Sequence, residues 1–171
     1  CNESLTSMVW RIPEVEDRLK FLIDQVERIT GLQEFGVYLN KLFTIDAIFL
    51  NEDRHMHNIA VMMNGKGEFD YCPIFDNGGA LLTDTTMDYP LDQDELLLMK
   101  EVHAKTISSD FDEQLDASEH FYGRNLRFSF TKKDVERLLA KPELNMYDMR
   151  IRTRVTNIFY QQMNKYKYLF Y

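Results

Sequence analysis

Apolar residues recur at every third or fourth position in two successive runs before residue 50. The first run is Val15, Leu19, Leu22, Ile23, Val26 and Ile29. The second is Leu32, Phe35, Tyr38, Leu39, Leu42, Ile45, Ile48 and Phe49. This spacing places the apolar residues on one face of an α-helix, so we predict two helices. Pro13 suits the first turn of the first helix, and Gly31 suits a left-handed cap at its end.

The short connection at Gly31 predicts that the two helices form an antiparallel pair. The second run is apolar over much of its circumference, which predicts a central position in the fold. The first eight residues show no period. We expect them to form a loose lead-in.

The pattern changes after residue 50. Residues 51–58 are polar and have no period, whereas residues 59–63 and 69–75 have the composition of strands on either side of the turn residues 64–67. This arrangement predicts a β-hairpin. The polar residues 76–79 follow the second strand. Antiparallel pairing would therefore bring them to the same open end of the hairpin as residues 51–58.

Helical patterns return in the second half, after a predicted loop over residues 83–90. We expect a helix that begins at Asp92 or Asp94 and ends near Ala104, and another near residues 112–121 within an ambiguous stretch. Thr131 and Asp134 resemble a capping box that opens a helix ending at Ala140. Residues 146–168 predict a long amphipathic helix. Its expected inward residues are Met149, Ile151, Val155, Ile158, Phe159 and Met163. The fold class is therefore α+β, mostly α-helical, with one hairpin, and we expect a single domain over residues 1–171.

Composition narrows the classes of partner and compartment. The 171 residues include 20 basic and 28 acidic side chains, giving a net charge of −8, which disfavours a bulk electrostatic grip on nucleic acid or anionic lipid. Two cysteines form no disulfide framework, so we expect a reducing, cytoplasmic location. No apolar run approaches the ~20 residues that span a bilayer, so we expect no membrane insertion. Arg150, Arg152 and Arg154 do not share one helix face, and we expect no nucleic acid to bind them.

Three oxygen-bearing side chains can meet at the open end of the hairpin. Asp53 and Asn58 lie in the first polar segment, and Asp76 begins the second. Carboxylate and amide oxygens are hard ligands that suit Mg²⁺, which also binds substrate phosphates. A further carboxylate can accept a proton from an attacking hydroxyl, and phosphoryl transfer otherwise depends on positioning and charge neutralisation. These residues therefore indicate phosphoryl-transfer chemistry.

The same residues carry a family resemblance. Asp53-Arg54-His55 followed by Asn58 resembles the D-R-H-x-x-N catalytic loop of phosphatidylinositol 3-kinase-like and HipA-like kinases. The segment I-F-D-N-G at residues 74–78 resembles the metal-binding Asp motif that follows that loop. The surrounding "NEDRHMHN…FDNGGALL" is more similar to the HipA-like bacterial Ser/Thr kinases and to related toxin-like kinases, including those of toxin–antitoxin pairs. The resemblance extends over roughly residues 46–82.

The resemblance implies a role for each residue of the motifs. Asp53 would be the catalytic base, and His55 would orient the loop or a phosphate. Asn58 and Asp76 would hold Mg²⁺ beneath the phosphates of ATP. The implied substrate is a protein that offers a Ser or Thr hydroxyl.

The family's N-lobe has no counterpart in this sequence. Such a lobe supplies a Gly-rich loop and a strand Lys, whereas only Gly31, Gly36, Lys20 and Lys41 precede Asp53, and both lysines fall in predicted helices. The chain therefore corresponds to a kinase C-lobe. An N-lobe segment or a partner chain is expected to supply the remaining parts.

Other functions fit some of the same residues. The chain could be a non-catalytic kinase-like binding or regulatory module, or a small-molecule or lipid kinase, although its negative charge weighs against a membrane-bound lipid. His55 and His57 could join Asp53 in the metal site of a hydrolase. Arg54 could simply pair with Glu52 or Asp46 at the surface.

Local structure alone could also explain several of these residues. Asp53 and Asn58 could cap a loop, and residues 76–78 could form a hairpin-exit turn. The acidic stretches over residues 84–95 and 110–119 fit solvated loops and helix starts, or a surface that recognises a basic peptide.

Overall fold

The N-terminal helix is the first difference from the sequence prediction. The computed structural model describes residues 4–171, so the first three residues of the predicted lead-in lie outside the described residues. Leu5–Trp10 forms helix α1, capped by the Ser4 hydroxyl, which accepts a hydrogen bond of 3.2 Å from the Ser7 amide. The prediction of a loose lead-in was wrong for the residues of α1, since Val9 is buried in the core. A six-residue helix is too short to show a period.

Helices α2 (Val15–Thr30) and α3 (Phe35–Phe49) confirm the two apolar runs. Gly31 has φ 78°, and its amide donates a hydrogen bond of 2.8 Å to Glu27 O, so it caps α2 in the left-handed conformation that the sequence predicts. Pro13 lies one residue before the N-cap, not in the first turn. The Arg18 side chain binds the carbonyls of Ile12 and Pro13, which holds this stretch outside the helix.

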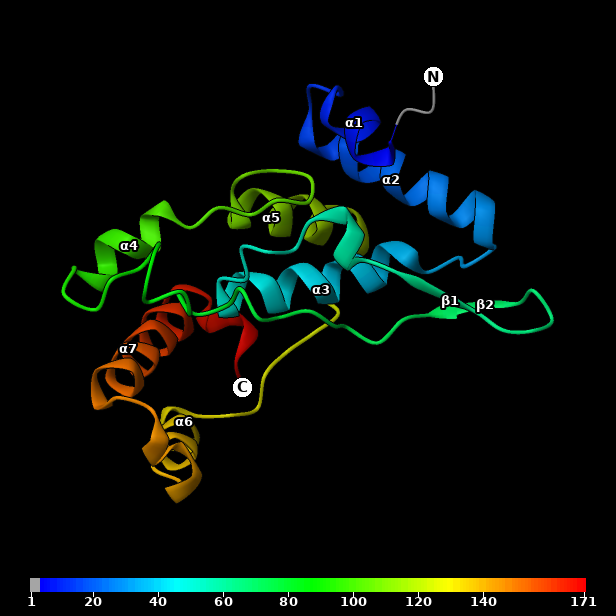
Figure 1. Cartoon of the computed structure of the whole chain (residues 1–171). Helices are drawn as coiled ribbons and strands as arrows, with labels where there is room; N and C mark the ends of the chain where they lie inside the picture. The colour runs from blue at the N-terminus through cyan, green and yellow to red at the C-terminus, as the bar shows by residue number, and fades with distance from the viewer. Residues whose placement is uncertain (1–3) are drawn as a thin grey trace.

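Helix α3 lies in the middle of the molecule (Figure 1). It contributes to both hydrophobic clusters of the core, with Leu39 and Phe43 in one and Ala47 and Ile48 in the other. Helices α5 (Phe111–Tyr122) and α7 (Met149–Lys165) pack against it. The predicted central position of this helix is therefore confirmed.

The hairpin is present but shorter than predicted. Strand β1 (Val61–Met63) pairs antiparallel with β2 (Phe69–Tyr71), with Val61 opposite Tyr71 and Met63 opposite Phe69. Before β1, residues Met56–Asn58 form a single 3₁₀ turn, η1. The Ile59 amide donates a hydrogen bond to Met56 O within this turn. After β2, Pro73 has no N–H to donate to a ladder. These two features limit the paired region, which projects from the helical body (Figure 1).

The helices of the second half follow the sequence prediction with shifted ends. Their bounds are α4 (Glu95–Glu101), α5 as above, α6 (Lys132–Leu139), the 3₁₀ turn η2 (Pro142–Met146), α7 as above and the 3₁₀ turn η3 (Lys167–Leu169). Helix α4 ends before the predicted Ala104, because the amide of Ala104 binds Ser109 O instead of continuing the helix. The capping box at Thr131 and Asp134 is confirmed.

The inward face of α7 is only partly apolar. Ile158 is buried as predicted, whereas Met149 is 71 % exposed. Arg154 and Gln162 take buried positions instead, and both place their polar ends on backbone carbonyls. An apolar period does not reveal such residues. The fold class is confirmed as mostly α-helical α+β with one small antiparallel sheet, and within residues 4–171 no helix is long and apolar enough to cross a membrane.

Candidate functional site

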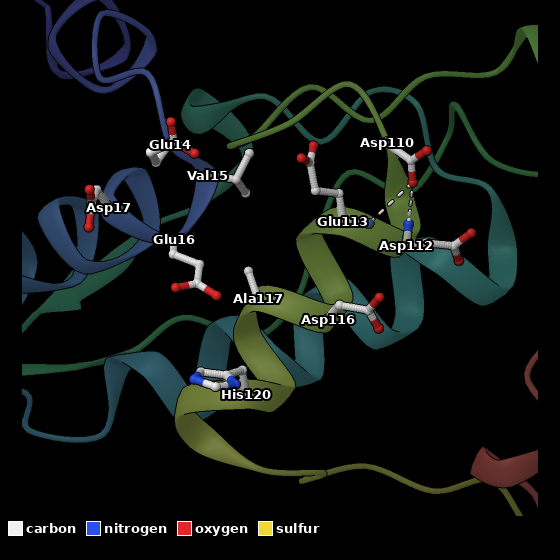
Figure 2. A pocket seen from close by; sticks show the side chains of 10 residues that line it. All are labelled: Glu14, Val15, Glu16, Asp17, Asp110, Asp112, Glu113, Asp116, Ala117 and His120. Atoms are coloured by element: carbon white, nitrogen blue, oxygen red, sulfur yellow. Dashed lines mark hydrogen bonds between the residues drawn. The ribbon is translucent and has the colours of Figure 1, made fainter.

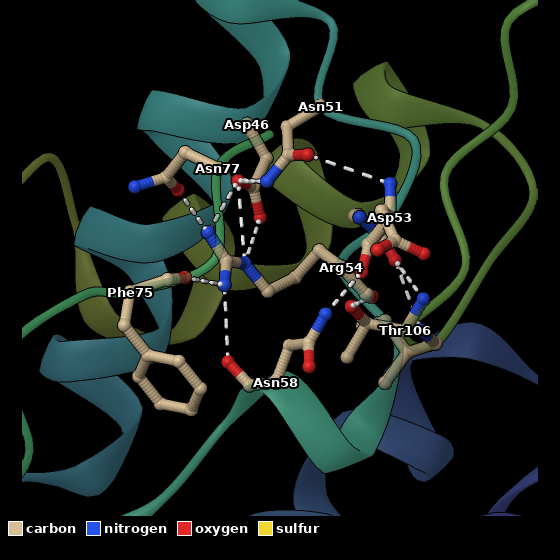
Figure 3. Close-up of polar contacts among 10 residues, drawn as sticks. Asp46, Asn51, Asp53, Arg54, Asn58, Phe75, Asn77 and Thr106 are labelled. Carbon is tan, nitrogen blue, oxygen red and sulfur yellow. Dashed lines mark hydrogen bonds and ion pairs between the residues drawn. The ribbon is translucent and has the colours of Figure 1, made fainter. Parts of the chain in front are cut away.

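The side chain of Arg54 lies at the centre of the polar segments singled out by sequence (Figure 3). It is 1 % exposed, and its Nε donates to Asp46 Oδ2 at 3.0 Å. Nη1 donates to the carbonyls of Asn58 at 3.0 Å and Phe75 at 2.6 Å, and Nη2 donates to Asn77 Oδ1. One guanidinium thus joins the end of α3, the loop over residues 53–58 and the segment that follows the hairpin.

Asp46 provides the buried carboxylate for this hub. It lies on α3, is fully buried, and also accepts a hydrogen bond of 2.9 Å from Asn51 Nδ2. Burial raises the pKa of the Asp46 carboxyl, and the hydrogen bonds and charge of Arg54 oppose that rise. Asp46 was one of the two partners expected for Arg54. The expected surface location was wrong, because Asp46 lies on the buried side of the central helix α3.

Asp53 and Asn58 occupy the two ends of one tight loop. The Asp53 carbonyl accepts a hydrogen bond of 2.8 Å from Asn58 Nδ2, and its amide binds Asn51 Oδ1 at 3.4 Å. The Asp53 side chain is 46 % exposed, whereas Asn58 is buried. The loop backbone is therefore fixed from both sides while the Asp53 carboxylate faces solvent.

Asp76 is exposed and has a left-handed backbone, with φ 53°. This conformation is uncommon for a residue other than glycine, but Asp adopts it more readily than most, and Leu50, Leu81 and Leu82 share it here. Its two neighbours, Phe75 and Asn77, are both held by Arg54. The contacts of both neighbours thus help to hold the backbone of Asp76 in this conformation.

The two polar segments lie directly against each other at Gly79. A Cβ on Gly79 would lie 2.7 Å from the Asp53 Cβ. The Glu52 amide donates to Gly79 O at 3.3 Å, and the Leu81 amide donates to Phe49 O at 2.8 Å. The segment that carries Asp76 therefore runs beside the loop that carries Asp53.

The rings of the two histidines of the loop, His55 and His57, meet edge to face. Their rings are 5.4 Å apart with an interplanar angle of 71°, and His55 Nε2 is 3.8 Å from Asp53 Oδ1. The His55 Nδ1 atom is buried without a hydrogen-bond partner. His57 is exposed. Over the described part of the chain, no three His, Cys, Asp or Glu side chains form a cluster that could hold a metal ion.

Thr106 contacts the loop of the candidate site, although no sequence pattern marks it. This buried residue donates from Oγ1 to the Arg54 carbonyl at 2.5 Å. It lies in the connection between α4 and α5, 52 residues along the chain from Arg54, and no local motif marks it. Asn77, by contrast, lies inside the F-D-N-G motif, so its proximity to the site could have been anticipated.

An acidic hollow of about 820 Å³ lies away from these residues, between the start of α2 and α5 (Figure 2). Its acidic lining residues are Glu14, Glu16, Asp17, Asp110, Asp112, Glu113 and Asp116. Burial, followed by the neighbouring carboxylates of Asp112, Glu119 and Asp110, raises the pKa of Asp116. None of Asp53, His55, Asn58 and Asp76 lines this hollow.

The chemistry of the donor set suits a hard divalent cation. The Asn58 amide oxygen and the Asp76 carboxylate are ligands of the kind that Mg²⁺ prefers, and an exposed carboxylate such as Asp53 can accept a proton. Comparison with protein families, curated proteins and solved structures finds no match for this chain.

Proposed function

We propose that this chain is the C-lobe part of a HipA-like protein kinase, which transfers a phosphoryl group from ATP to a Ser or Thr hydroxyl of a protein. The observation that carries the proposal is that the Arg54 side chain binds both motifs. Its guanidinium binds the carbonyls of Asn58 and Phe75 at once. The D-R-H-x-x-N loop and the F-D-N segment, which are separate in sequence, are thereby joined as phosphoryl transfer would require.

Each motif residue then has a role that its surroundings support. The exposed carboxylate of Asp53 accepts the proton of the attacking hydroxyl, and its anchored backbone fixes where that carboxylate lies. Asn58 and Asp76 would hold Mg²⁺, which would neutralise charge on the ATP phosphates. His55, with Nε2 3.8 Å from the Asp53 carboxylate, orients the loop or a phosphate.

The remaining parts of the kinase would come from elsewhere. An N-lobe segment or a partner chain supplies the loop that covers the phosphates and the lysine that binds them. The cytoplasmic location expected from the two cysteines of the sequence is part of this proposal.

The proposal is tested by two substitutions, with Mg²⁺-ATP binding and phosphoryl transfer measured separately. The full chain, with any protein that co-purifies, is incubated with Mg²⁺-ATP and a basic acceptor protein, and intact masses are recorded. Asp76→Asn should weaken Mg²⁺-dependent ATP binding and abolish transfer. Asp53→Asn should bind ATP as before and fail to transfer, because it loses only the proton acceptor.

Asp70→Asn is the matched control. Asp70 is an exposed carboxylate on β2, so its loss should change neither measurement. Full transfer by Asp76→Asn would overturn the metal assignment, and full transfer by Asp53→Asn would overturn the base. A wild-type chain that neither binds Mg²⁺-ATP nor transfers phosphate with its co-purifying proteins would instead favour a non-catalytic binding module.

A further inference from the structure

Residues 83–90 form the loop between the Asp76 segment and the residues that precede α4. Hydrogen bonds hold this loop at both ends. At the start, the Thr83 hydroxyl donates to Gly78 O at 2.8 Å. Within the loop, the Tyr89 amide donates to Asp84 O at 2.8 Å and closes a turn. The residues between are mostly exposed, and Met87 is the most exposed large apolar side chain among them. Within the loop, Asp84 Oδ1 accepts hydrogen bonds from the amides of Thr86 at 3.1 Å and Met87 at 2.9 Å, so the turn is held internally as well as at its ends.

Arg154 of α7 provides the fixed point at the far end. Its side chain is 4 % exposed, and Nη1 and Nη2 donate to the carbonyls of Tyr89 at 2.5 Å and Pro90 at 2.6 Å. Burying a guanidinium is costly unless its donors are satisfied. The two carbonyls therefore cannot move away from Arg154 without a large loss of free energy.

Tyr89 connects this fixed point to the loop of the candidate site. Its ring is buried, and its hydroxyl donates to Glu52 Oε2 at 2.7 Å. Burial, followed by the Glu52 carboxylate, raises the pKa of Tyr89, so the hydroxyl remains a donor at neutral pH. Glu52 directly precedes Asp53, and its amide binds Gly79 O.

We propose that Tyr89 is a positioning residue for the candidate active site. Through Glu52 it holds the Asp53 loop against Gly79, and Arg154 holds Tyr89 in turn. The position of α7 is thereby coupled to the relative placement of the Asp53 and Asp76 segments. The consequence for phosphoryl transfer rests on the proposed function, whereas the coupling of the loop to α7 does not.

Tyr89→Phe tests the coupling, because it removes the hydroxyl and keeps the ring. Amide hydrogen exchange is measured at Glu52 and Leu81, whose amides bind across the two segments. We expect exchange at both to accelerate by about tenfold, the equivalent of one hydrogen bond to a charged group. Where the chain transfers phosphate, kcat should fall while the KM for ATP stays unchanged.

Two further variants separate positioning from a general loss of stability. Tyr160→Phe is the matched control, because the Tyr160 hydroxyl also donates to a glutamate, Glu136, in a contact between α7 and α6. It should leave exchange at Glu52 and Leu81 unchanged. Glu52→Gln keeps an acceptor for Tyr89 and should preserve most of the protection.

The outcomes decide the proposal in either direction. Unchanged exchange at Glu52 and Leu81 in Tyr89→Phe, equal acceleration throughout the chain, or an unchanged kcat would each overturn it. If the wild-type chain binds no Mg²⁺-ATP, the proposed kinase function fails, yet the exchange result still decides whether Tyr89 holds the loop.

Discussion

At the scale of single residues, the ion pair between Arg54 and Asp46 has a structural purpose that its charge alone does not explain. Both side chains are almost wholly removed from solvent, and the cost of desolvating two charges can equal or exceed their attraction. The same guanidinium also satisfies two backbone carbonyls and the Asn77 side chain. The pair therefore fixes the geometry of the loops more than it adds net stability.

Arg54→Met tests this role, because it keeps a long apolar stem and leaves Asp46 buried without its cation. We expect a loss of about 3–5 kcal/mol in the free energy of unfolding, measured by urea denaturation. The double variant Asp46→Leu with Arg54→Met should recover part of that loss, since no buried charge remains. A single variant as stable as the wild type would contradict the assignment.

Asp116 should make the stability of the protein depend on pH. Its pKa is raised by burial and by neighbouring carboxylates, so the ionised form is disfavoured in the folded state. Stability associated with this group is therefore present below the unfolded pKa and lost as the pH rises through the folded pKa. Asp116 is exposed, so solvent screens the neighbouring charges and the effect is small. Asp116→Asn should raise the Tm slightly at pH 7 and have no such effect in acid below the carboxyl pKa values. An equal shift at both pH values would show that another cause operates.

The sequence reveals the residues of the candidate motifs more readily than the residues that hold these motifs in place. Asp53, Asn58 and Asp76 are recognisable because their spacing in sequence resembles a known pattern. Thr106 and Tyr89 are not, because their contacts with the site depend on how distant helices pack. The central position of α3 was predicted, but the apolar spacing does not show that Asp46 is buried on it, so the interior position of Arg54 was missed.

At the scale of elements, the candidate site depends on a close approach of two loops. Gly79 faces Asp53 so closely that any side chain at this position would meet the Asp53 Cβ. Gly78, the preceding residue, has open space where a side chain would begin. The two adjacent glycines therefore differ in a way that substitution can reveal.

Gly79→Ala should displace the Asp53 loop, because the new methyl group would overlap the Asp53 Cβ. Overpacking of this kind costs about 1–3 kcal/mol, so we expect a lower Tm and faster amide exchange at Glu52. Gly78→Ala is the matched control and should leave both unchanged. Equal behaviour of the two variants would contradict the close approach.

The elements themselves follow from apolar period where the period is long. Helices α2 and α3 are predicted with small errors at their ends, and α6 is identified by its capping box. The short elements are predicted less well. Helix α1 is missed because six residues show no period, and the strands are overextended because Pro73 and the turn at Met56–Asn58 end the pairing.

At the scale of the whole molecule, α3 unites the two hydrophobic clusters. Buried polar side chains reinforce the same helix from the second half of the chain: Asn40 Nδ2 donates to Ser118 Oγ at 3.0 Å, and Gln162 Nε2 donates to Ala47 O at 2.6 Å. Segments from both sides of the hairpin are therefore joined through α3 and not only through the backbone that connects them. This long-range packing is the part of the fold that local sequence patterns do not reveal.

A cut in the turn of the projecting hairpin should divide the chain into two fragments that stay associated. Its turn holds exposed Lys66 between Gly65 and Gly67, away from the core. A protease that cuts after lysine should open the backbone there, yet α3 on one fragment and α5 and α7 on the other should keep the halves together. We expect the nicked protein to elute as one species and to separate only in denaturant. Halves that part in native buffer would contradict this. The two fragments, produced apart, could then be used to reconstitute the candidate site from separate polypeptides.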